Sequence, residues 1–329
     1  MNFLSPNINE QIFTSLQIGD NRPLWSVVIP TFNCADFLKL TLDSVLIQDR
    51  GPDEMEIIVV DDLSTKDNPE SVVKQYGKGR VQFYRQGKNV GKSQNYATGI
   101  RLAKGHYIHL LHGDDTIANN FYSSIEKLFE QNPQASAGFC RCNYINEEGE
   151  IIGETSVLLK ESGVLTDFIG VIAVWQCIQP PSIVFKREVY EQIGGYDNRL
   201  QYIEDWEFYV RCALHFDFAY TPEILANYRV FPTNSSSQSI KGGKRVAAIR
   251  QVISIIDSYL PKEIKKRIVN ERKEAVAIYL LNYIPLVVSK RDFKGFIKFS
   301  IAFFAFNRKV KLVGRYFRFV INFKKYLKD

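Results

Sequence analysis

The sequence predicts an α/β protein with a mainly parallel sheet flanked by helices, followed by a helical extension. Short apolar runs alternate with helical segments from Trp25 to about Tyr144. From Arg245 onward the pattern is helical and increasingly basic. An alternating β-α-β order is typical of parallel strands joined by right-handed crossovers. The loops after successive strands should therefore lie at one edge of the sheet, where open α/β sheets bind ligands.

The first half contains four predicted strands with helices between them. Each strand is a short apolar run, and each helix carries apolar residues three and four positions apart. The predicted strands are residues 25–31, 56–60, 81–84 and 106–111. The predicted helices are residues 35–48, 69–76 and 92–103.

The second half is less regular. A helix could begin near Ile117, capped by Asp115 or Thr116. Pro180-Pro181 should lead into a strand, and Gly194-Gly195 should end a short helix. The predicted strands here are residues 180–186, 216–220 and 224–230, the helices are 187–193 and 204–214, and the Ser- and Gly-rich segment 234–243 is expected to be a loop.

Size bears on the number of domains, and cysteine content favours an intracellular protein. A chain of 329 residues with 45% apolar content can form one large domain, or one domain with an extension. Its cysteines are odd in number and contain no Cys-x-x-Cys pair, so we expect reduced thiols in the cytoplasm. Cys140 and Cys142 fit two positions of one strand better than a metal clip.

No membrane-spanning segment is expected. Residues 1–22 are polar and lack the hydrophobic stretch of a secretory signal. The uncharged runs at 168–185, 275–289 and 299–307 are interrupted or short, whereas a spanning helix needs about 20 apolar residues.

Positive charge is concentrated at the C-terminus. Residues 286–329 contain 12 Lys or Arg and 2 acidic residues, a net charge of +10, and the rest of the chain has a net charge of −4. Phenylalanines and other apolar residues recur at helical spacing among these cations. Such helices either lie on an anionic membrane surface or pack their apolar faces on the protein and leave the charges in water. No nucleic-acid-binding module accompanies the charge, so no nucleic-acid partner is expected.

Adjacent carboxylates follow two of the predicted strands. Asp61-Asp62 ends the second strand, and His112-Gly113-Asp114-Asp115 follows the fourth. Paired carboxylates repel one another and resist burial, but a divalent cation with a diphosphate offsets that cost. Turns in which aspartates bond to their own backbone are the alternative at 61–64, and a helix cap is the alternative at 115.

A third acidic pair, Glu204-Asp205, begins a predicted helix. It could be catalytic or only the acidic first turn that the helix dipole favours. Asn89 to Asn95 opens another helix, where Gly91 permits close approach and Lys92 adds charge for an anion. A simple cap by Asn89 or Ser93 explains that segment equally well.

Two enzyme classes are disfavoured. The first strand ends Pro30-Thr31-Phe32-Asn33 and lacks the Gly-x-Gly-x-x-Gly turn of dinucleotide-binding dehydrogenases. A nucleotidyltransferase shares the sheet plan but would show a Gly-rich basic loop after the first strand, and residues 30–36 contain none.

Six segments in order resemble the family 2 glycosyltransferases of the GT-A fold. They are residues 26–33, 57–64, 89–95, 110–115, 194–197 and 204–207. Single segments are weak signals, but the order and spacing are specific. The resemblance covers about residues 25–230 and implies a Rossmann-like nucleotide-binding half at 25–116, an acceptor-binding half at 117–240, an N-terminal arm at 1–24 and a basic helical extension at 241–329.

The resemblance implies a role for each segment, with residues 194–197 and 204–207 as motifs on the acceptor side. The donor, a nucleotide-sugar, would be bound by residues of the first four segments and by one arginine, namely Pro30, Thr31, Phe32, Asn33, Asp61, Asp62, Asn89, Gly91, Lys92, Asn95, Asp114 and Arg229. A divalent cation, Mn²⁺ or Mg²⁺, would be held by Asp115 with Asp114 and His112. Asp205 would be the general base and Glu204 its neighbour, giving inversion at the sugar.

The chain departs from the family pattern in two places. His112 stands where the family usually has the first Asp of Asp-x-Asp, and histidine is a poorer ligand for Mg²⁺ than for Mn²⁺. Phe231 replaces the histidine of a Tyr-Arg-x-His segment, which leaves Arg229 either facing the diphosphate or facing water.

The predicted activity is transfer of a sugar to an acceptor hydroxyl in polysaccharide, lipid-linked or cell-surface glycan synthesis. The protein would be cytoplasmic and could lie peripherally on the inner membrane face through its basic tail. A non-catalytic nucleotide-sugar-binding module with the same fold is the rival hypothesis, and His112 is the feature that could support it.

Overall fold

A computed structural model of the chain describes residues 22–307 and 309–321. These residues form two compact units. Unit 1 comprises residues 22–168, 177–199 and 211–230, and unit 2 comprises residues 169–176, 200–210 and 231–321. Most of the predicted N-terminal arm lies outside the described residues, as do Arg308, Phe323, Lys324 and Lys325 of the basic tail. The predicted boundaries at 116 and 240 stay predictions.

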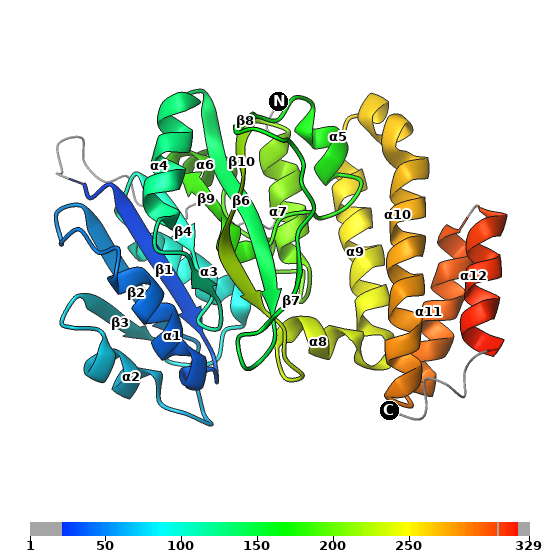
Figure 1. Ribbon diagram of the computed structural model, residues 1–329, viewed down its shortest axis with the longest axis horizontal. Helices are drawn as coiled ribbons and strands as arrows, with labels where there is room; N and C mark the ends of the chain where they lie inside the picture. Colours follow the sequence, from blue (N-terminus) through cyan, green and yellow to red (C-terminus); the bar gives the residue numbers. More distant parts are fainter. Residues whose placement is uncertain (1–21, 308, 322–329) are drawn as a thin grey trace. The chain divides into compact units, whose positions relative to one another are not determined.

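Unit 1 is built around one mixed sheet (Figure 1). Its strands run in the order β3-β2-β1-β4-β9-β6-β10-β5, with β7 paired to β6 and β8 paired to β10. Their bounds are β1 Trp25–Thr31, β2 Met55–Asp61, β3 Val81–Arg85, β4 Tyr107–Leu110, β5 Thr116–Ile117, β6 Ala135–Ile145, β7 Ile151–Glu154, β8 Gly163–Val164, β9 Ile183–Lys186 and β10 Asp217–Arg229.

The parallel half of the sheet confirms the predicted fold class. Strands β1 to β4 pair in parallel, while β9 runs antiparallel to both β4 and β6. The 140 and 142 cysteines lie buried in β6, as expected of two residues in one strand. The helices of this unit are α1 Ala35–Leu46, α2 Pro69–Tyr76, α3 Lys92–Leu102, α4 Phe121–Gln131, α6 Arg187–Ile193 and the 3-10 helix η1 Pro180–Ser182.

Side-chain alternation in β1 places helices on both faces of the sheet. Val27 and Ile29 join one core with Leu38 of α1 and Phe121 of α4. On the opposite face α3 lies so close that a Cβ on Gly99 would come within 2.3 Å of the Val28 side chain. Glycine at that position therefore lets α3 pack directly on the sheet.

Four local predictions were wrong. The strand predicted at 180–186 begins only at Ile183, because Pro180–Ser182 form the 3-10 helix η1. No helix begins near Ile117, because residues 116–117 form β5 against β10, and α4 begins at Phe121. The strands predicted at 216–220 and 224–230 are one strand, β10, in which a register shift accommodates Pro222, a residue without an amide donor. The segment 234–243 is not a loop: it contains α8 Ser235–Ile240 and the 3-10 helix η2 Lys241–Gly243, and Asn234 caps α8 by accepting from Ser237 N at 2.8 Å.

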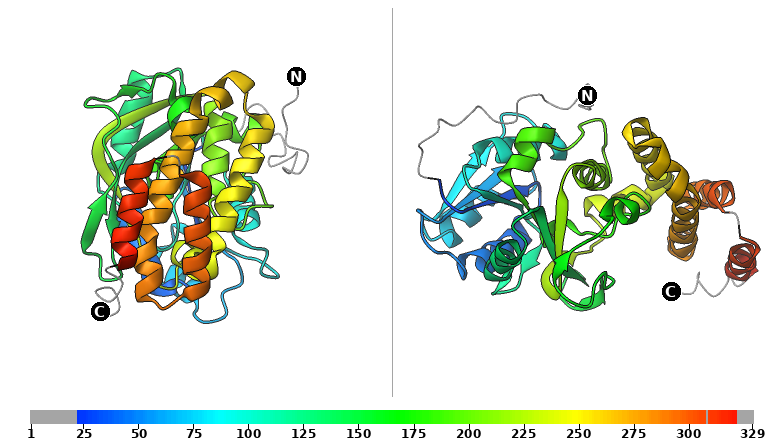
Figure 2. Two further views of the ribbon diagram at one scale, coloured as in Figure 1. Left: turned by 90° about the vertical axis from the view of Figure 1, so that its right-hand side faces the viewer. Right: turned by 90° about the horizontal axis from the view of Figure 1, so that it is seen from above.

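Unit 2 confirms the helical extension. It contains α8, η2, α9 Lys244–Tyr259, α10 Lys262–Ser289, α11 Phe293–Phe306 and α12 Val310–Ile321, together with most of α5 Phe168–Ile172 and α7 Glu204–Ala213. Its core is centred on Leu280, Ile284, Phe299 and Phe303. In Figure 2, α11 and α12 lie beside α10. Within the described residues no helix combines the length and apolarity needed to cross a membrane.

His109 in β4 is expected to make stability sensitive to acid. Burial lowers the pKa of His109 to about 3, so the folded protein binds fewer protons than the unfolded chain below about pH 6.5. Stability should therefore fall as the pH drops from about 6.5 toward 3. In His109→Gln, whose amide can replace the ring contacts to Pro181 O and Tyr122 Oη, the loss of unfolding free energy between about pH 7 and pH 5 should shrink by about 2 kcal/mol.

Chemical denaturation at the two pH values measures this difference. Exchange of the exposed His106 for glutamine controls for the loss of a histidine as such. Equal pH dependence in the wild type and His109→Gln would contradict the prediction.

Candidate active site

The carboxyl ends of β1, β2 and β4 meet, as the sequence predicted. The amide of Asp62 donates to the Thr31 carbonyl at 3.0 Å, and the amide of Gly113 donates to the Pro30 carbonyl at 3.1 Å. Pro30 and Thr31 are buried in β1, whereas the ring of Phe32 is 46% exposed. An exposed aromatic ring at this edge is suited to stacking on a nucleobase.

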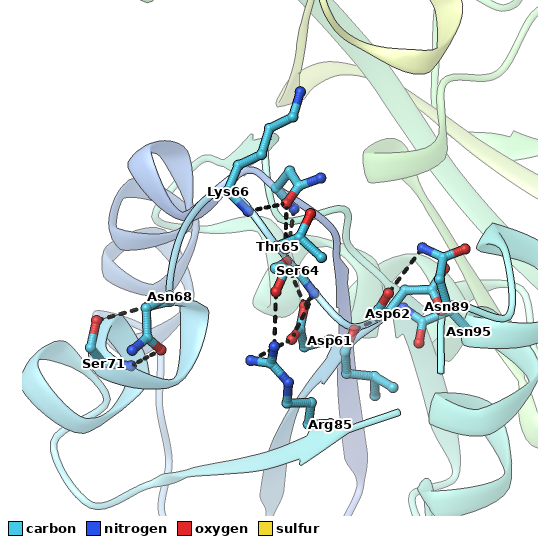
Figure 3. Close-up of polar contacts among 12 residues, drawn as sticks. Asp61, Asp62, Ser64, Thr65, Lys66, Asn68, Ser71, Arg85, Asn89 and Asn95 are labelled. Atoms are coloured by element: carbon cyan, nitrogen blue, oxygen red, sulfur yellow. Dashed lines mark hydrogen bonds and ion pairs between the residues drawn. The ribbon is translucent and has the colours of Figure 1, made fainter. Parts of the chain in front are cut away.

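Asp61 stabilises the turn that follows β2 (Figure 3). Its Oδ1 accepts from Ser64 N at 3.0 Å and from Ser64 Oγ at 2.6 Å, and Arg85 lies 3.3 Å from Oδ2. Leu63 between them has a φ of 60°. The alternative that this aspartate serves turn chemistry is therefore confirmed for Asp61.

Asn33 connects the end of β1 to the same turn. Its Oδ1 accepts from Thr65 N at 2.9 Å and Lys66 N at 3.0 Å, and its own amide donates to Ser64 Oγ at 2.8 Å. Asn33 has a φ of 52°, a conformation that asparagine tolerates better than most residues. Its side chain thus shapes the loop beside Phe32.

Asp62 binds the N-terminus of α3. Its two carboxylate oxygens accept from Val90 N at 2.7 Å and Gly91 N at 2.9 Å. Asn89 donates to the Asp62 carbonyl at 3.0 Å, as Figure 3 shows. Neither Asn89 nor Ser93 caps the helix, because Gly91, with a φ of 81°, is the N-cap residue. Burial raises the pKa of Asp62, and the amides of residues 90 and 91 lower it. The Asp62 carboxylate thus binds the two amides that directly precede α3.

Asn95 is a buried structural residue in α3. Its amide donates to the Val60 carbonyl at 2.8 Å, and its Oδ1 accepts from Gln86 at 3.1 Å. Lys92, at the start of the helix, is half-buried, and its charge contributes to the electrostatics of His112 described below.

His112, Asp114 and Asp115 form a cluster that suits a divalent cation. One ligand atom from each lies within 4.8 Å of the others, and His112 Nδ1 is 4.0 Å from Asp115 Oδ2. Asp115 is fully buried, and Oδ2 has no hydrogen-bond partner among the described residues, while Oδ1 accepts from Arg229 N at 2.8 Å. A buried carboxylate oxygen without a donor is costly, and a cation would satisfy it.

The electrostatics of this cluster agree with a cation site. Burial raises the pKa of Asp115 well above its ordinary value, and the charge of Asp114 raises it further. Burial also raises the pKa of Asp114 to about 6 and lowers that of His112 to about 3, with Lys92 contributing to the latter. A neutral imidazole is the form that ligates metals, and a bound cation would favour both ionised carboxylates.

Several residues that support the cluster were not predicted. The His112 ring stacks on Tyr96 at 5.2 Å, and Tyr96 meets Tyr196 edge-on at 5.3 Å. Thr41 of α1 donates to the Asp115 carbonyl at 2.8 Å. These contacts join residues that are not neighbours in the chain, so no local sequence pattern predicts them.

Arg229, at the end of β10, is buried and braces the loop that carries the aspartates. Its Nε donates to the Asp114 carbonyl at 2.9 Å, and Nη1 donates to the carbonyls of Asn146 and Glu147, each at 3.0 Å. The guanidinium also lies 4.7 Å from the ring centroid of Phe37. The alternative of an arginine facing water is wrong, because only 2% of the residue is exposed.

The segment Gly194 to Asp197 is fixed by arginines. Arg211 donates to the carbonyls of Ile193 and Gly195, each at 2.6 Å, and the buried Asp197 pairs with Arg199. Gly194 has a φ of 74°, which ends α6. The backbone of this predicted acceptor-side motif is thus rigidly held.

Glu204 and Asp205 begin α7, as predicted, and both lie in unit 2. Asp205 Oδ1 accepts from Trp206 N at 2.9 Å, and Oδ2 accepts from Gln176 Nε2 at 2.9 Å. Glu204 is buried and Asp205 half-buried. Ile203 immediately before them has a φ of 55°, a strained conformation for a β-branched residue, and such strain is concentrated at functional sites. Gln176 is a further residue that sequence reasoning missed.

Comparisons with known proteins agree with this geometry. The family model described as Glycosyl transferase family 2 matches residues 26–194. A Methanocaldococcus jannaschii protein named uncharacterized glycosyltransferase MJ1057 is 27% identical over 214 residues, which cover 64% of this chain and 72% of that protein.

Two solved structures share the fold. The crystal structure of S. aureus TarS 1-349 in complex with UDP-GlcNAc has a TM-score of 0.61 at 15% identity, covering 92% of this chain and 81% of that one. The mannosyltransferase PcManGT from Pyrobaculum calidifontis, in complex with GDP-Man and Mn²⁺, has a TM-score of 0.59 at 19% identity, covering 93% and 82%.

Proposed function

The chain belongs to glycosyl transferase family 2, and from that premise we propose that it transfers a sugar to an acceptor hydroxyl with inversion of configuration at the anomeric carbon. It is a nucleotide-sugar-dependent glycosyltransferase of the EC 2.4 class with a GT-A fold. The observation that carries the proposal of metal-assisted sugar transfer is the His112, Asp114 and Asp115 cluster, in which the buried Oδ2 of Asp115 lacks a donor among the described residues. The proposal of inversion rests on Asp205 as the general base.

The donor would bind at the carboxyl ends of β1, β2 and β4. Phe32 offers its exposed ring to the base, and Asn33, Asp61 and Asp62 hold the surrounding loops in shape. Arg229 braces this proposed donor site through the Asp114 carbonyl. The site is completed by Pro30, Thr31, Asn89, Gly91, Lys92 and Asn95. Most of these residues would thus act by shaping the site.

The cation would be held by Asp115 with Asp114 and His112. When bound, Mn²⁺ or Mg²⁺ supplies Lewis-acid stabilisation of the charge that builds on the departing diphosphate. The residues fit this group because a second carboxylate and a neutral imidazole lie close to the buried Asp115 carboxylate.

Asp205 would be the general base, and Glu204 would orient it or bind the acceptor. The carboxylate takes the proton of the acceptor hydroxyl while that oxygen bonds to the anomeric carbon and the bond from this carbon to the diphosphate oxygen breaks. Attack from the face opposite the leaving group inverts the configuration. Gln176, bonded to Oδ2, would position the carboxylate for this transfer.

The proposed acceptor is a hydroxyl of a growing glycan. We place the reaction in polysaccharide, lipid-linked or cell-surface glycan synthesis on the cytoplasmic side of a membrane. Support for the compartment comes from the cysteines, all five of which are free thiols in the structure.

Incubation of the pure protein with nucleotide-sugars and Mn²⁺ tests the proposal. UDP-GlcNAc and GDP-Man, which the two structural relatives bind, are the first donors to use. Release of nucleoside diphosphate that requires the metal, with an inverted product, is the expected result. Tight donor binding without transfer or hydrolysis across acceptors would instead identify a binding module and contradict the proposal.

His112 is expected to set the metal preference. An imidazole suits Mn²⁺ better than Mg²⁺, so the wild type should turn over faster with Mn²⁺. In His112→Asp, a third carboxylate should favour Mg²⁺ and lower the Mn²⁺-to-Mg²⁺ ratio of kcat/KM by about tenfold. Steady-state kinetics with each metal measure the ratio, and His106→Asp at an exposed site is the control. An unchanged ratio in His112→Asp would show that this side chain does not contact the cation.

A further inference from the structure

Helix α11 exposes a continuous apolar stripe. Phe293, Ile297, Ile301 and Phe304 follow one another four, four and three residues apart, so they lie on one helical face. Their exposed fractions are 66%, 55%, 61% and 46%. Scattered exposed apolar residues are ordinary, but four in line on one helix are a patch that indicates an interaction surface.

Helix α12 repeats the pattern. Val310, Phe317 and Ile321 share one face with Gly314, and the three side chains are 88%, 50% and 79% exposed. The two helices thus present the same arrangement within unit 2. We call the two sets of exposed apolar residues, four on α11 and three on α12, the outer stripe.

The outer stripe is not a core face left uncovered by a loose helix. The opposite face of α11 is already packed, with Phe299, Ala302 and Phe303 fully buried. Tyr316 of α12 stacks on Phe303 at 5.3 Å, and its hydroxyl pairs with Ser300 Oγ at 3.0 Å. Both helices therefore have a packed inner face. Phe304 also meets Tyr316 edge-on at 4.9 Å, and the rest of the outer stripe is additional apolar surface.

Positive charge accompanies the outer stripe. The sequence from Phe293 to Ile321 contains seven Lys or Arg and no Asp or Glu. Lys294 and Lys311 are exposed one position beyond Phe293 and Val310. Two other cations of this region are used internally, since Lys309 pairs with Glu274 at 2.6 Å and Arg315 donates to Asn282 at 3.0 Å. The surface thus combines bulky apolar side chains with lysine ammonium groups at their flank.

We propose that the outer stripe docks on an anionic phospholipid surface. Phenylalanine and isoleucine side chains enter the boundary between headgroups and acyl chains, while neighbouring lysines bind lipid phosphates. A second copy of the chain would bring two basic surfaces together without a compensating carboxylate in residues 293–321. This inference does not depend on the donor chemistry, because it rests on unit 2 alone.

Vesicle sedimentation of the full-length protein tests the docking. Binding is expected to vesicles of phosphatidylcholine with about 30% phosphatidylglycerol, to be weak on phosphatidylcholine alone, and to decline with added salt. The variant Lys294→Glu/Lys311→Glu should bind the anionic vesicles at least about tenfold more weakly. Its control is Lys78→Glu/Lys127→Glu, which reverses two exposed lysines of unit 1 and should bind like the wild type.

A second pair of variants tests the apolar contribution. Ile297→Ser should weaken vesicle binding, whereas Ile47→Ser, which alters an isoleucine that is 64% exposed in unit 1, should not. Retained nucleotide-sugar turnover and an unchanged melting temperature show that each variant is folded. Failure of the wild type to sediment with anionic vesicles, or equal binding by test and control variants, would overturn the proposal. So would a dimer in solution that Ile297→Ser dissociates, because the outer stripe would then face a second copy.

Discussion

Replacement of Asp115 by asparagine is expected to reduce kcat/KM by at least about a hundredfold. Lewis-acid stabilisation is worth several kcal/mol, and each 1.4 kcal/mol is about a factor of ten in rate. Asparagine keeps the oxygen that accepts from Arg229 N but loses the charge that a cation requires. Calorimetric titration with Mn²⁺ should show a matching loss of metal affinity.

Protein stability separates this effect from misfolding. Burial raises the pKa of Asp115, so the ionised carboxylate is disfavoured by the fold and its neutral replacement should not lower the melting temperature. Asp217→Asn, at the exposed start of β10, is the control and should leave turnover and metal affinity unchanged. Full activity and full metal affinity in Asp115→Asn would exclude this residue as a ligand.

Replacement of Asp205 by asparagine is expected to lower transfer by about 10²- to 10⁴-fold while donor binding persists. The amide oxygen can still accept from Trp206 N, so the first turn of α7 should remain intact. The loss should appear in kcat with little change in the Kd for the nucleotide-sugar, because a general base acts on the acceptor proton. Single-turnover transfer and equilibrium donor binding measure the two quantities separately.

A matched control addresses the alternative that Asp205 only serves the dipole of its helix. Glu263 occupies the first turn of α10, also in unit 2, and is exposed. Glu263→Gln removes a comparable helix-dipole interaction and should leave transfer unchanged. Similar losses in both variants would assign Asp205 to helix stability and leave the base unidentified.

The parallel half of the fold could be predicted because its signals are local. Strands β1 to β4 are apolar runs, and α2 and α6 have the predicted bounds because proline and glycine mark their ends. Prediction failed where the secondary structure of a segment depends on a strand that is distant in the sequence. Residues 116–117 are a strand only because β10 lies beside them, and β10 is continuous only because β6 pairs along its length.

The same distinction applies to the candidate site. Motif spacing placed His112, Asp114 and Asp115 together at the sheet edge, and the structure confirms that they converge. The motif spacing could not indicate three contacts that depend on packing and rotamers. These are the bonds of Asp61 within its own turn, the stacking of Tyr96 on His112, and the contact of Gln176 with Asp205. The acidic residues that spacing singled out therefore fall into two groups in the structure. Asp61 and Asp62 hold loops through hydrogen bonds, and Asp114 and Asp115 are candidate cation ligands.

The contact between Asp62 and α3 has a consequence for anion selectivity. The amides of Val90 and Gly91, directly before this helix, already donate to an internal carboxylate, so these two donors are not open to free phosphate or other cellular anions. A diphosphate that enters the proposed donor site would need other groups to neutralise its charge, and a cation held by Asp115 would supply this. The protein would then recognise its donor as a metal complex, and small anions that coordinate metals weakly would be poor competitors.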